Sequence, residues 1–447
     1  MIAIKMRAIV AILTRAAGLF VCSVASATIP IVQWTQPSGV QVFLVASPGV
    51  PMVDIRVEFD AGGRRDPVGQ AGLASVMAAA LSDGVRATAH APALDENGLG
   101  EAWADLGATF SAGASGDRFS VSVRSLTDPD LLDKAIALAA RQLAEPAFPA
   151  AVWRRDRLKW IASLKEADTR PATLADRAFT QAVYGLHPYA AEMTGASLQR
   201  IRVQDMAALH ARALRPCFAK VTVVGALDRT QTDAVVTQLF ARLPVGRCVP
   251  LPQVPDVEPL RKAQEVHIAF ASAQAHVLVG QPGYARSDPD HLALVVGNTI
   301  LGGGFTSRLN QEVREKRGLT YGVDSYFAPG LHAGAFTISL QTRPDQVQQA
   351  LQLVREELAG FVDHGPTEAE LQAAKDHLMG GFPLLLDGNV KLLDNVANLA
   401  WYGLPLDYLE TWVWQVQALT VSAVHDAYVR KLHPERMVTV VLGRGPP

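Results

Sequence analysis

The chain has 447 residues, 49% of them hydrophobic, and its 41 basic and 43 acidic residues give a formal net charge of −2. This length is enough to bury two or more domain cores. The balanced charge gives no electrostatic basis for nucleic-acid binding, so we expect no nucleic-acid partner.

The first 27 residues resemble a secretory signal peptide. Lys5, Arg7 and Arg15 make the start of the chain basic, residues 16–24 are apolar, and residues 25–27 read Ala-Ser-Ala, which fits an A-x-A cleavage site. The apolar run is about half as long as a bilayer span, so we expect no stable membrane insertion. The mature protein is therefore expected in a bacterial periplasm.

Strand and helix patterns follow one another along the chain. Apolar periodicity predicts the following elements: strand 119–126, helices 129–143 and 151–165, strand 218–224, helix 229–243, strand 336–341, helices 346–361 and 367–380, and strand 438–443. Strands that alternate with helices and then give way to helical runs favour an α+β fold, with helices packed against mixed sheets.

An internal repeat organises these elements. Tyr184-Gly185 and Tyr402-Gly403 are each followed, 32 residues after the tyrosine, by a proline, and after 41 residues by the glycine that ends a strand. Phe119 lies 65 residues before Tyr184, and Phe336 lies 66 residues before Tyr402. The sequence therefore predicts two homologous α/β units related by duplication. We place them at residues 28–246 and 262–447, joined by a proline-rich linker over 247–261.

Two cysteines, Cys217 and Cys248, remain after removal of the signal peptide. An oxidising compartment favours a disulfide between them, which would close a loop of about thirty residues. Two unpaired buried thiols are the alternative.

A glycine-rich stretch in the second unit carries the most specific motif. Gly302, Gly303 and Gly304 allow a sharp turn or a close approach, and a charged segment over 308–317 predicts a short amphipathic helix that stops at Gly318. Strand-like residues follow at 319–323, so the turn is expected to bring Arg314 near Tyr321. Without further context, this pattern also fits a solvated charged helix beside an edge strand.

The stretches GGGFTSRL and REKRGLTY resemble the pitrilysin (insulinase, M16) family of zinc metallopeptidases, in its half-length, processing-peptidase-like branch. The resemblance implies a clamshell-like pair of units. It also implies that Arg314 and Tyr321 contact the substrate backbone. Gly302 to Gly304 would then line the substrate cavity, or they form only a structural turn.

The same resemblance shows that the zinc site of the family is lost. The H-x-x-E-H positions of the family fall on Ser75, Ala78 and Ala79, and the third ligand position falls on Ser163. Serine and alanine cannot replace imidazole and carboxylate, so we expect this chain to bind no metal. Peptidase activity would then require zinc in a partner subunit.

These observations predict a non-catalytic, substrate-binding subunit of a heterodimeric periplasmic zinc peptidase that degrades oligopeptides. Its partners would be a homologous zinc-bearing subunit and a peptide substrate, and Arg314 and Tyr321 would complete the active site of that subunit. The alternative is a non-enzymatic scaffold or core subunit of an envelope complex, because this fold does not by itself imply proteolysis.

Overall fold

The computed structural model describes residues 29–244, 246 and 248–443. The predicted signal peptide lies outside the described residues. The helices and strands of the described residues belong to one compact unit that begins at Ile31.

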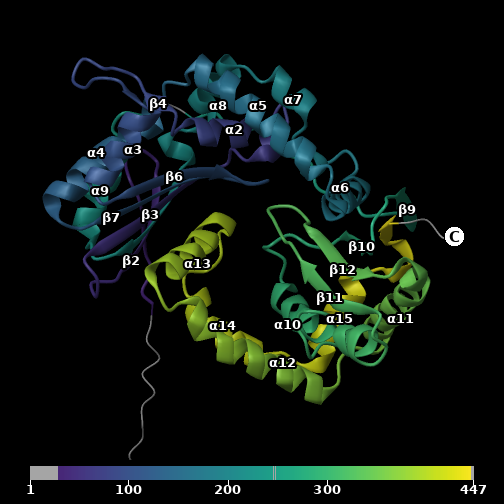
Figure 1. Cartoon of the computed structure of the whole chain (residues 1–447). Helices are drawn as coiled ribbons and strands as arrows, with labels where there is room; N and C mark the ends of the chain where they lie inside the picture. The colour runs from purple at the N-terminus through teal and green to yellow at the C-terminus, as the bar shows by residue number, and fades with distance from the viewer. Residues whose placement is uncertain (1–28, 245, 247, 444–447) are drawn as a thin grey trace, which may run out of the picture. The chain divides into compact units, whose positions relative to one another are not determined.

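The first half of the chain builds a six-stranded sheet covered by helices (Figure 1). Its elements are β1 (Val32–Thr35), β2 (Gln41–Ala46), β3 (Met52–Phe59), η1 (Gly63–Arg65), α2 (Leu73–Ala80), β4 (Gly84–Val85), β5 (Leu94–Asp95), α3 (Glu96–Asp105), β6 (Thr109–Ala114), β7 (Phe119–Leu126), α4 (Pro129–Ala144), α5 (Ala150–Ala167), α6 (Pro171–Tyr184), η2 (Pro188–Ala190), α7 (Gly195–Arg200), α8 (Val203–Ala213), η3 (Pro216–Phe218), β8 (Lys220–Gly225) and α9 (Arg229–Phe240).

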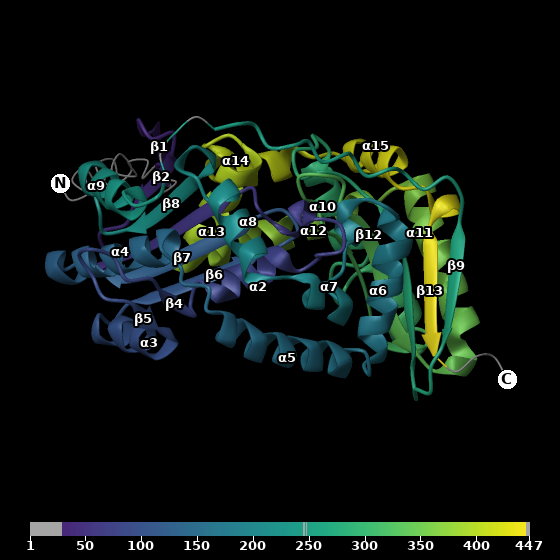
Figure 2. The same ribbon diagram turned by 90° about the horizontal axis from the view of Figure 1, so that it is seen from above.

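The second half builds a five-stranded sheet with its own helices (Figure 2). Its elements are β9 (Gln264–Ala269), β10 (Ala275–Pro282), α10 (His291–Leu301), the π-helical segment η4 (Asn310–Glu315), β11 (Thr320–Phe327), β12 (Ala335–Thr342), η5 (Pro344–Gln346), α11 (Val347–His364), α12 (Glu368–Gly381), η6 (Phe382–Leu385), α13 (Asn389–Tyr402), α14 (Tyr408–Ala418), α15 (Val421–Lys431), η7 (Pro434–Arg436) and β13 (Val438–Gly443).

Local sequence explains most of these boundaries. Strand β7 alternates buried and partly exposed residues, as a strand with one face on the core must. Helix α4 begins where the Asp128 side chain accepts hydrogen bonds from the backbone N–H groups of Asp130 and Leu131. Helix α9, which was predicted over 229–243, ends three residues earlier than predicted, at Phe240. Residues 248–263, which include most of the predicted linker, form no helix or strand.

The two sheets have the same connectivity. In the first, the order is β1-β2-β8-β3-β7-β6, with β2 parallel to β8 and the remaining neighbours antiparallel. In the second, the order β9-β13-β10-β12-β11 repeats this arrangement, again with one parallel pair followed by antiparallel pairs. The predicted α+β fold and its internal duplication are confirmed, and β6 corresponds to β11 as an edge strand.

Each half contributes a helix to the sheet of the other half. Helix α6 of the first half packs on β10 and β13, while α13 of the second half packs on β8 and β3 (Figures 1 and 2). Phe179 and Val183 of α6 are buried in a core with Leu278, Val438 and Val440 of the second sheet. Helix α6 ends at Tyr184 and α13 ends at Tyr402, the tyrosines of the repeated Tyr-Gly pairs. The two helices are therefore equivalent in the repeat, and each packs on the sheet of the other half.

Among the residues that the structure describes, no helix is both long enough and apolar enough to cross a membrane.

Candidate functional site

The glycine-rich turn follows α10 directly, and its three glycines differ in their surroundings. A Cβ on Gly302 would lie 2.4 Å from Ser325 Oγ, and one on Gly303 would lie 2.9 Å from the Cα of Thr299. At Gly304, by contrast, no atom lies within 4 Å of that position. Packing therefore requires the first two glycines but not Gly304, and both Gly303 and Gly304 line a pocket.

The charged helix is short, and its apolar side is buried in the core of the second half. Helical residues begin at Arg308, and Leu309 and Val313 have no exposed surface. Gly318 ends the helix with φ 62°, and its N–H donates to the carbonyl of Arg314 at 2.9 Å. These features confirm the predicted amphipathic segment and its glycine stop.

The geometry of this helix is π rather than α over Asn310–Glu315. The Asn310 amide nitrogen donates to the carbonyls of Gly304 at 3.1 Å and Val323 at 2.8 Å. One buried side chain therefore joins the glycine-rich turn, the helix and β11. Single π turns of this kind occur frequently at functional sites.

Strand β11 contains a bulge that reorients Tyr321. Thr320 pairs with Thr342, but Val323 pairs with Leu340, so three steps along β11 match two steps along β12. The bulge separates residues that regular alternation would place on one face: Val323 is buried, whereas Tyr321 is 89% exposed.

Arg314 differs from the other cations around it. Arg308 pairs with Glu370 at 2.6 Å, and Lys316 and Arg317 both pair with Glu312. Within the described part of the chain, Arg314 has no ion pair or side-chain hydrogen bond, and its guanidinium carbon lies 5.1 Å from the centre of the Phe305 ring. Its N–H donors are therefore available to an external acceptor.

Arg314 and Tyr321 thus flank one turn, on two elements that pack together. The Tyr321 hydroxyl likewise has no hydrogen-bond partner among the residues that the structure covers. Tyr321 also lines a pocket of about 350 Å³ beside β11, which is the outer strand of its sheet. A guanidinium, a phenol and a free strand edge can together hold an extended peptide by its carbonyl groups.

The positions at which the family resemblance predicts zinc ligands and the base lie on α2 and α5. Ser75, Ala78 and Ala79 share α2, with Ala78 buried and Ala79 exposed, and Ser163 is exposed on α5. Over residues 29–443, leaving out the two undescribed positions, no group of three or more His, Cys, Asp or Glu side chains is arranged to hold a metal ion.

A pocket of about 600 Å³ opens beside Ala79 and includes Asp83 and Glu96. Burial, together with the nearby carboxylates of Asp156 and Glu96, raises the pKa of Asp83 to about 6. Asp83 and Glu96 belong to no group of three or more metal-ligating side chains among the described residues.

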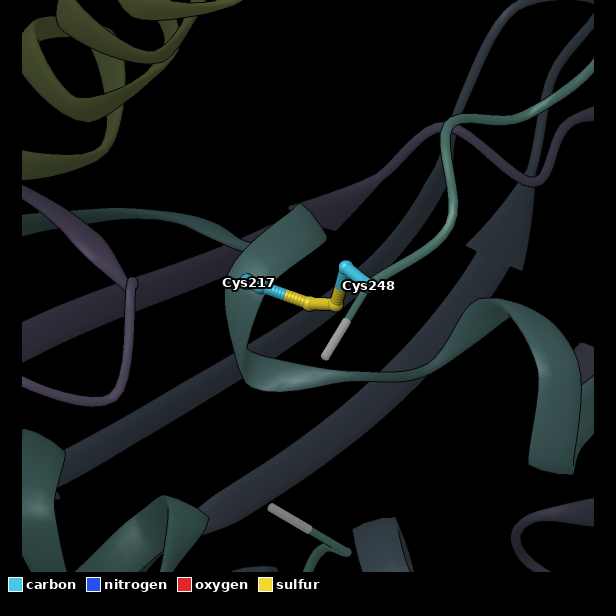
Figure 3. Close-up of a disulfide and its surroundings, with 2 residues drawn as sticks. All are labelled: Cys217 and Cys248. Atoms are coloured by element: carbon cyan, nitrogen blue, oxygen red, sulfur yellow. A yellow bond between two sulfur atoms is a disulfide. The ribbon is translucent and has the colours of Figure 1, made fainter. Parts of the chain in front are cut away.

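Cys217 and Cys248 are joined by a disulfide in the structure, with their Cα atoms 6.4 Å apart (Figure 3). Cys217 lies in η3, and Cys248 lies at the start of the segment that leads toward the second half. The predicted pairing therefore agrees with the fold.

Sequence reasoning missed Phe305 and Asn310, as well as a cluster that ties the halves together. In that cluster the Asp117 carboxylate accepts from the Tyr189 hydroxyl at 2.7 Å and from the backbone N–H of Leu331 at 2.8 Å. An aromatic residue next to three glycines was a signal for Phe305. Nothing local pointed to the long-range partners of Asp117.

Residues 200–378 match the family model described as the peptidase M16 inactive domain. A crystal structure titled as the peptidase M16 inactive domain of Pseudomonas fluorescens is 34% identical, with a TM-score of 0.87, over 93% of this chain and 98% of that one. The Helicobacter pylori protein named non-peptidase homolog YmxG is 26% identical over 84% of this chain and 85% of its own length.

Two further similarities are partial. An uncharacterized zinc protease of Streptomyces coelicolor is 37% identical, but the match covers 40% of this chain and only 41% of that protein. The periplasmic protease PqqL of Escherichia coli has the same fold, with a TM-score of 0.79 at 20% identity, over 93% of this chain but 46% of that one. In PqqL this fold therefore occupies about half of a longer chain.

Proposed function

This chain belongs to the M16 family of peptidases, and we propose that it is a non-catalytic subunit that binds peptide for a homologous, zinc-bearing partner. One contrast carries the proposal. The predicted zinc and base positions hold Ser75, Ala78, Ala79 and Ser163, whereas the Arg314 guanidinium and the Tyr321 hydroxyl make no hydrogen bond within the described chain.

The proposed division of labour follows from the chemistry of each subunit. The partner supplies the zinc and the base that activates water. Arg314 donates to a substrate carbonyl or to the oxyanion that develops during attack, and Tyr321 donates to the same region. The peptide lies extended along β11, whose outer edge is free to pair with it.

The proportions of PqqL support pairing with a homologue. This chain covers 46% of PqqL, so a protein described as a protease contains this fold together with about as much chain again. A separate homologous subunit would supply the second half. The proposal places the assembly in the periplasm, because residues 1–27 resemble a signal peptide, and gives it unfolded oligopeptides as substrates.

Affinity purification of the tagged protein from its native cells tests this proposal directly. We expect a near-stoichiometric homologue with an intact H-x-x-E-H motif and bound zinc, identified by mass spectrometry and metal analysis. Recovery of the chain alone, or with unrelated envelope proteins, would reject the split peptidase and favour a scaffold.

A further inference from the structure

A pocket of about 540 Å³ lies between the glycine-rich turn and α12. Its walls include Ile300, Phe305 and the alanines Ala369, Ala373 and Ala374. A volume of this size can hold a large side chain together with the backbone that carries it.

Two features of the pocket have no explanation in the packing of this chain. Phe305 is 73% exposed at the rim, although water contact with so large an apolar side chain is unfavourable. Gly304 has open space where a Cβ would lie, and its φ is not in the left-handed region. An approaching ligand would bury the ring and use the space that the missing side chain leaves.

The polar side chains of the pocket are mostly satisfied within the protein. Both oxygens of Glu370 accept hydrogen bonds from Arg308, at 2.6 and 2.7 Å. The Gln311 amide donates to the carbonyl of Thr306 at 2.8 Å, and the Thr299 hydroxyl donates to the carbonyl of Val295 at 3.1 Å. His377 is the remaining ionisable residue of the lining, so a ligand group that enters here meets mainly carbon, one imidazole and the paired Glu370.

We infer that this pocket is a specificity site that takes a large apolar side chain of the peptide. The Phe305 ring connects the pocket to Arg314, whose guanidinium stacks on it. A peptide carbonyl bound by Arg314 therefore lies beside a residue whose side chain can enter the pocket. This inference rests on the proposed function, and it adds a preference for phenylalanine-like or leucine-like residues.

The test measures binding to the purified mature protein alone. The probes are the peptides N-acetyl-Gly-Gly-X-Gly-Gly-amide with X as Phe, Leu, Ala or Asp, titrated by ligand-detected nuclear magnetic resonance. Burial of the larger side chain predicts that the Phe and Leu peptides bind about tenfold more tightly than the Ala peptide. The Asp peptide should bind no better than the Ala peptide.

Ala373→Trp fills the pocket from an exposed position of α12, so the fold should tolerate it. In this variant the Phe and Ala peptides should bind equally. Gln372→Trp places the same ring on the neighbouring exposed position, outside the pocket lining, and should keep the tenfold preference. Equal binding of all four peptides to the wild type, or a preference that survives Ala373→Trp, would overturn the inference.

This outcome can be separated from that of the proposed function. If the Phe preference is present and is lost in Ala373→Trp, but no zinc-bearing homologue co-purifies, the specificity pocket is supported and the two-subunit peptidase is rejected. If a zinc-bearing complex is recovered but binding does not depend on X, only the pocket inference fails.

Discussion

The amine of Lys220, on β8 of the first sheet, donates hydrogen bonds to the carbonyl oxygens of Ala400 at 2.6 Å and Trp401 at 3.1 Å. These carbonyls belong to the last turn of α13, which comes from the other half of the chain. The same amine lies 5.9 Å from the centre of the Trp401 ring. A cation at a helix C-terminus donates to carbonyls that have no partner within the helix, and it is attracted by the negative end of the helix dipole. This contact therefore stabilises the packing of α13 on the sheet of the first half.

We predict that Lys220→Met lowers the free energy of unfolding by roughly 1–3 kcal/mol, because two carbonyls lose a charged donor. Burial lowers the pKa of Lys220 and the nearby Glu58 carboxylate raises it. Removing the amine therefore also leaves Glu58 with one cation fewer. Urea denaturation measures the change, and hydrogen exchange should show lost protection in α13. Lys134→Met, at an exposed position of α4, is the control and should change stability little.

Substitution of Arg314 or Tyr321 should slow peptide cleavage by the assembled complex. Loss of one donor to a developing oxyanion costs on the order of 10²-fold in kcat or more, so we expect effects of about 10–10³-fold for Arg314→Ala and Tyr321→Phe. The zinc content and the subunit ratio should stay unchanged, because neither side chain makes a hydrogen bond or an ion pair within the described chain.

Tyr326→Phe is a matched control for Tyr321→Phe. Tyr326 lies on the same strand and is 48% exposed, but it lies beyond the bulge. Its substitution should leave the steady-state rate near that of the wild type. If the two phenylalanine variants had equal rates, Tyr321 would have no special part in cleavage.

The pairing of Arg308 with Glu370 should make stability depend on acid pH. The Arg308 guanidinium lowers the pKa of Glu370 to about 2, with help from the N–H and hydroxyl groups of Thr367. Because the folded pKa is depressed, the stabilisation is fully present above the ordinary glutamate pKa near 4.5 and is lost as pH falls through about 2.

Glu370→Gln isolates this contribution. The difference in unfolding free energy between wild type and variant should reach about 1 kcal/mol near pH 6, because solvent screens this partly exposed pair, and shrink toward zero near pH 2. Denaturation midpoints across that range measure it. A difference that is constant with pH would mean that the ion pair contributes nothing through its charge.

Breaking the Cys217–Cys248 disulfide should destabilise the first half of the chain. The bond spans 31 residues, and closing a loop of that length restricts the unfolded chain by roughly 3 kcal/mol. Mass spectrometry of the unreduced protein should find the linked peptides, and Cys217→Ser with Cys248→Ser should lower the melting temperature. Reductant should lower the melting temperature of the wild type but not that of the double variant; equal melting temperatures for all of these forms would show that the bond is not formed or not stabilising.

Much of the fold was predictable because its signals are local or repeat at fixed spacing. Strand β7 was predicted with its observed ends at Phe119 and Leu126, since its residues alternate in polarity. The stop at Gly318 was equally visible, because few residues other than glycine tolerate the backbone conformation found there. Helix α9 ends at Phe240 rather than at the predicted residue 243, where the apolar pattern continued beyond the last helical turn.

The sequence by itself determined the duplication, the presence of Arg314 and Tyr321 in one motif, and the identity of Ser75, Ala79 and Ser163, the residues at which the family resemblance predicts zinc ligands. Residue identity and spacing carry all of these. Only the tertiary structure decided that α6 and α13 exchange sheets, that a bulge turns Tyr321 outward, and that Phe305 stands at the rim of a pocket. Those features depend on which distant strands pair and which faces meet, and periodicity along one chain does not record such contacts.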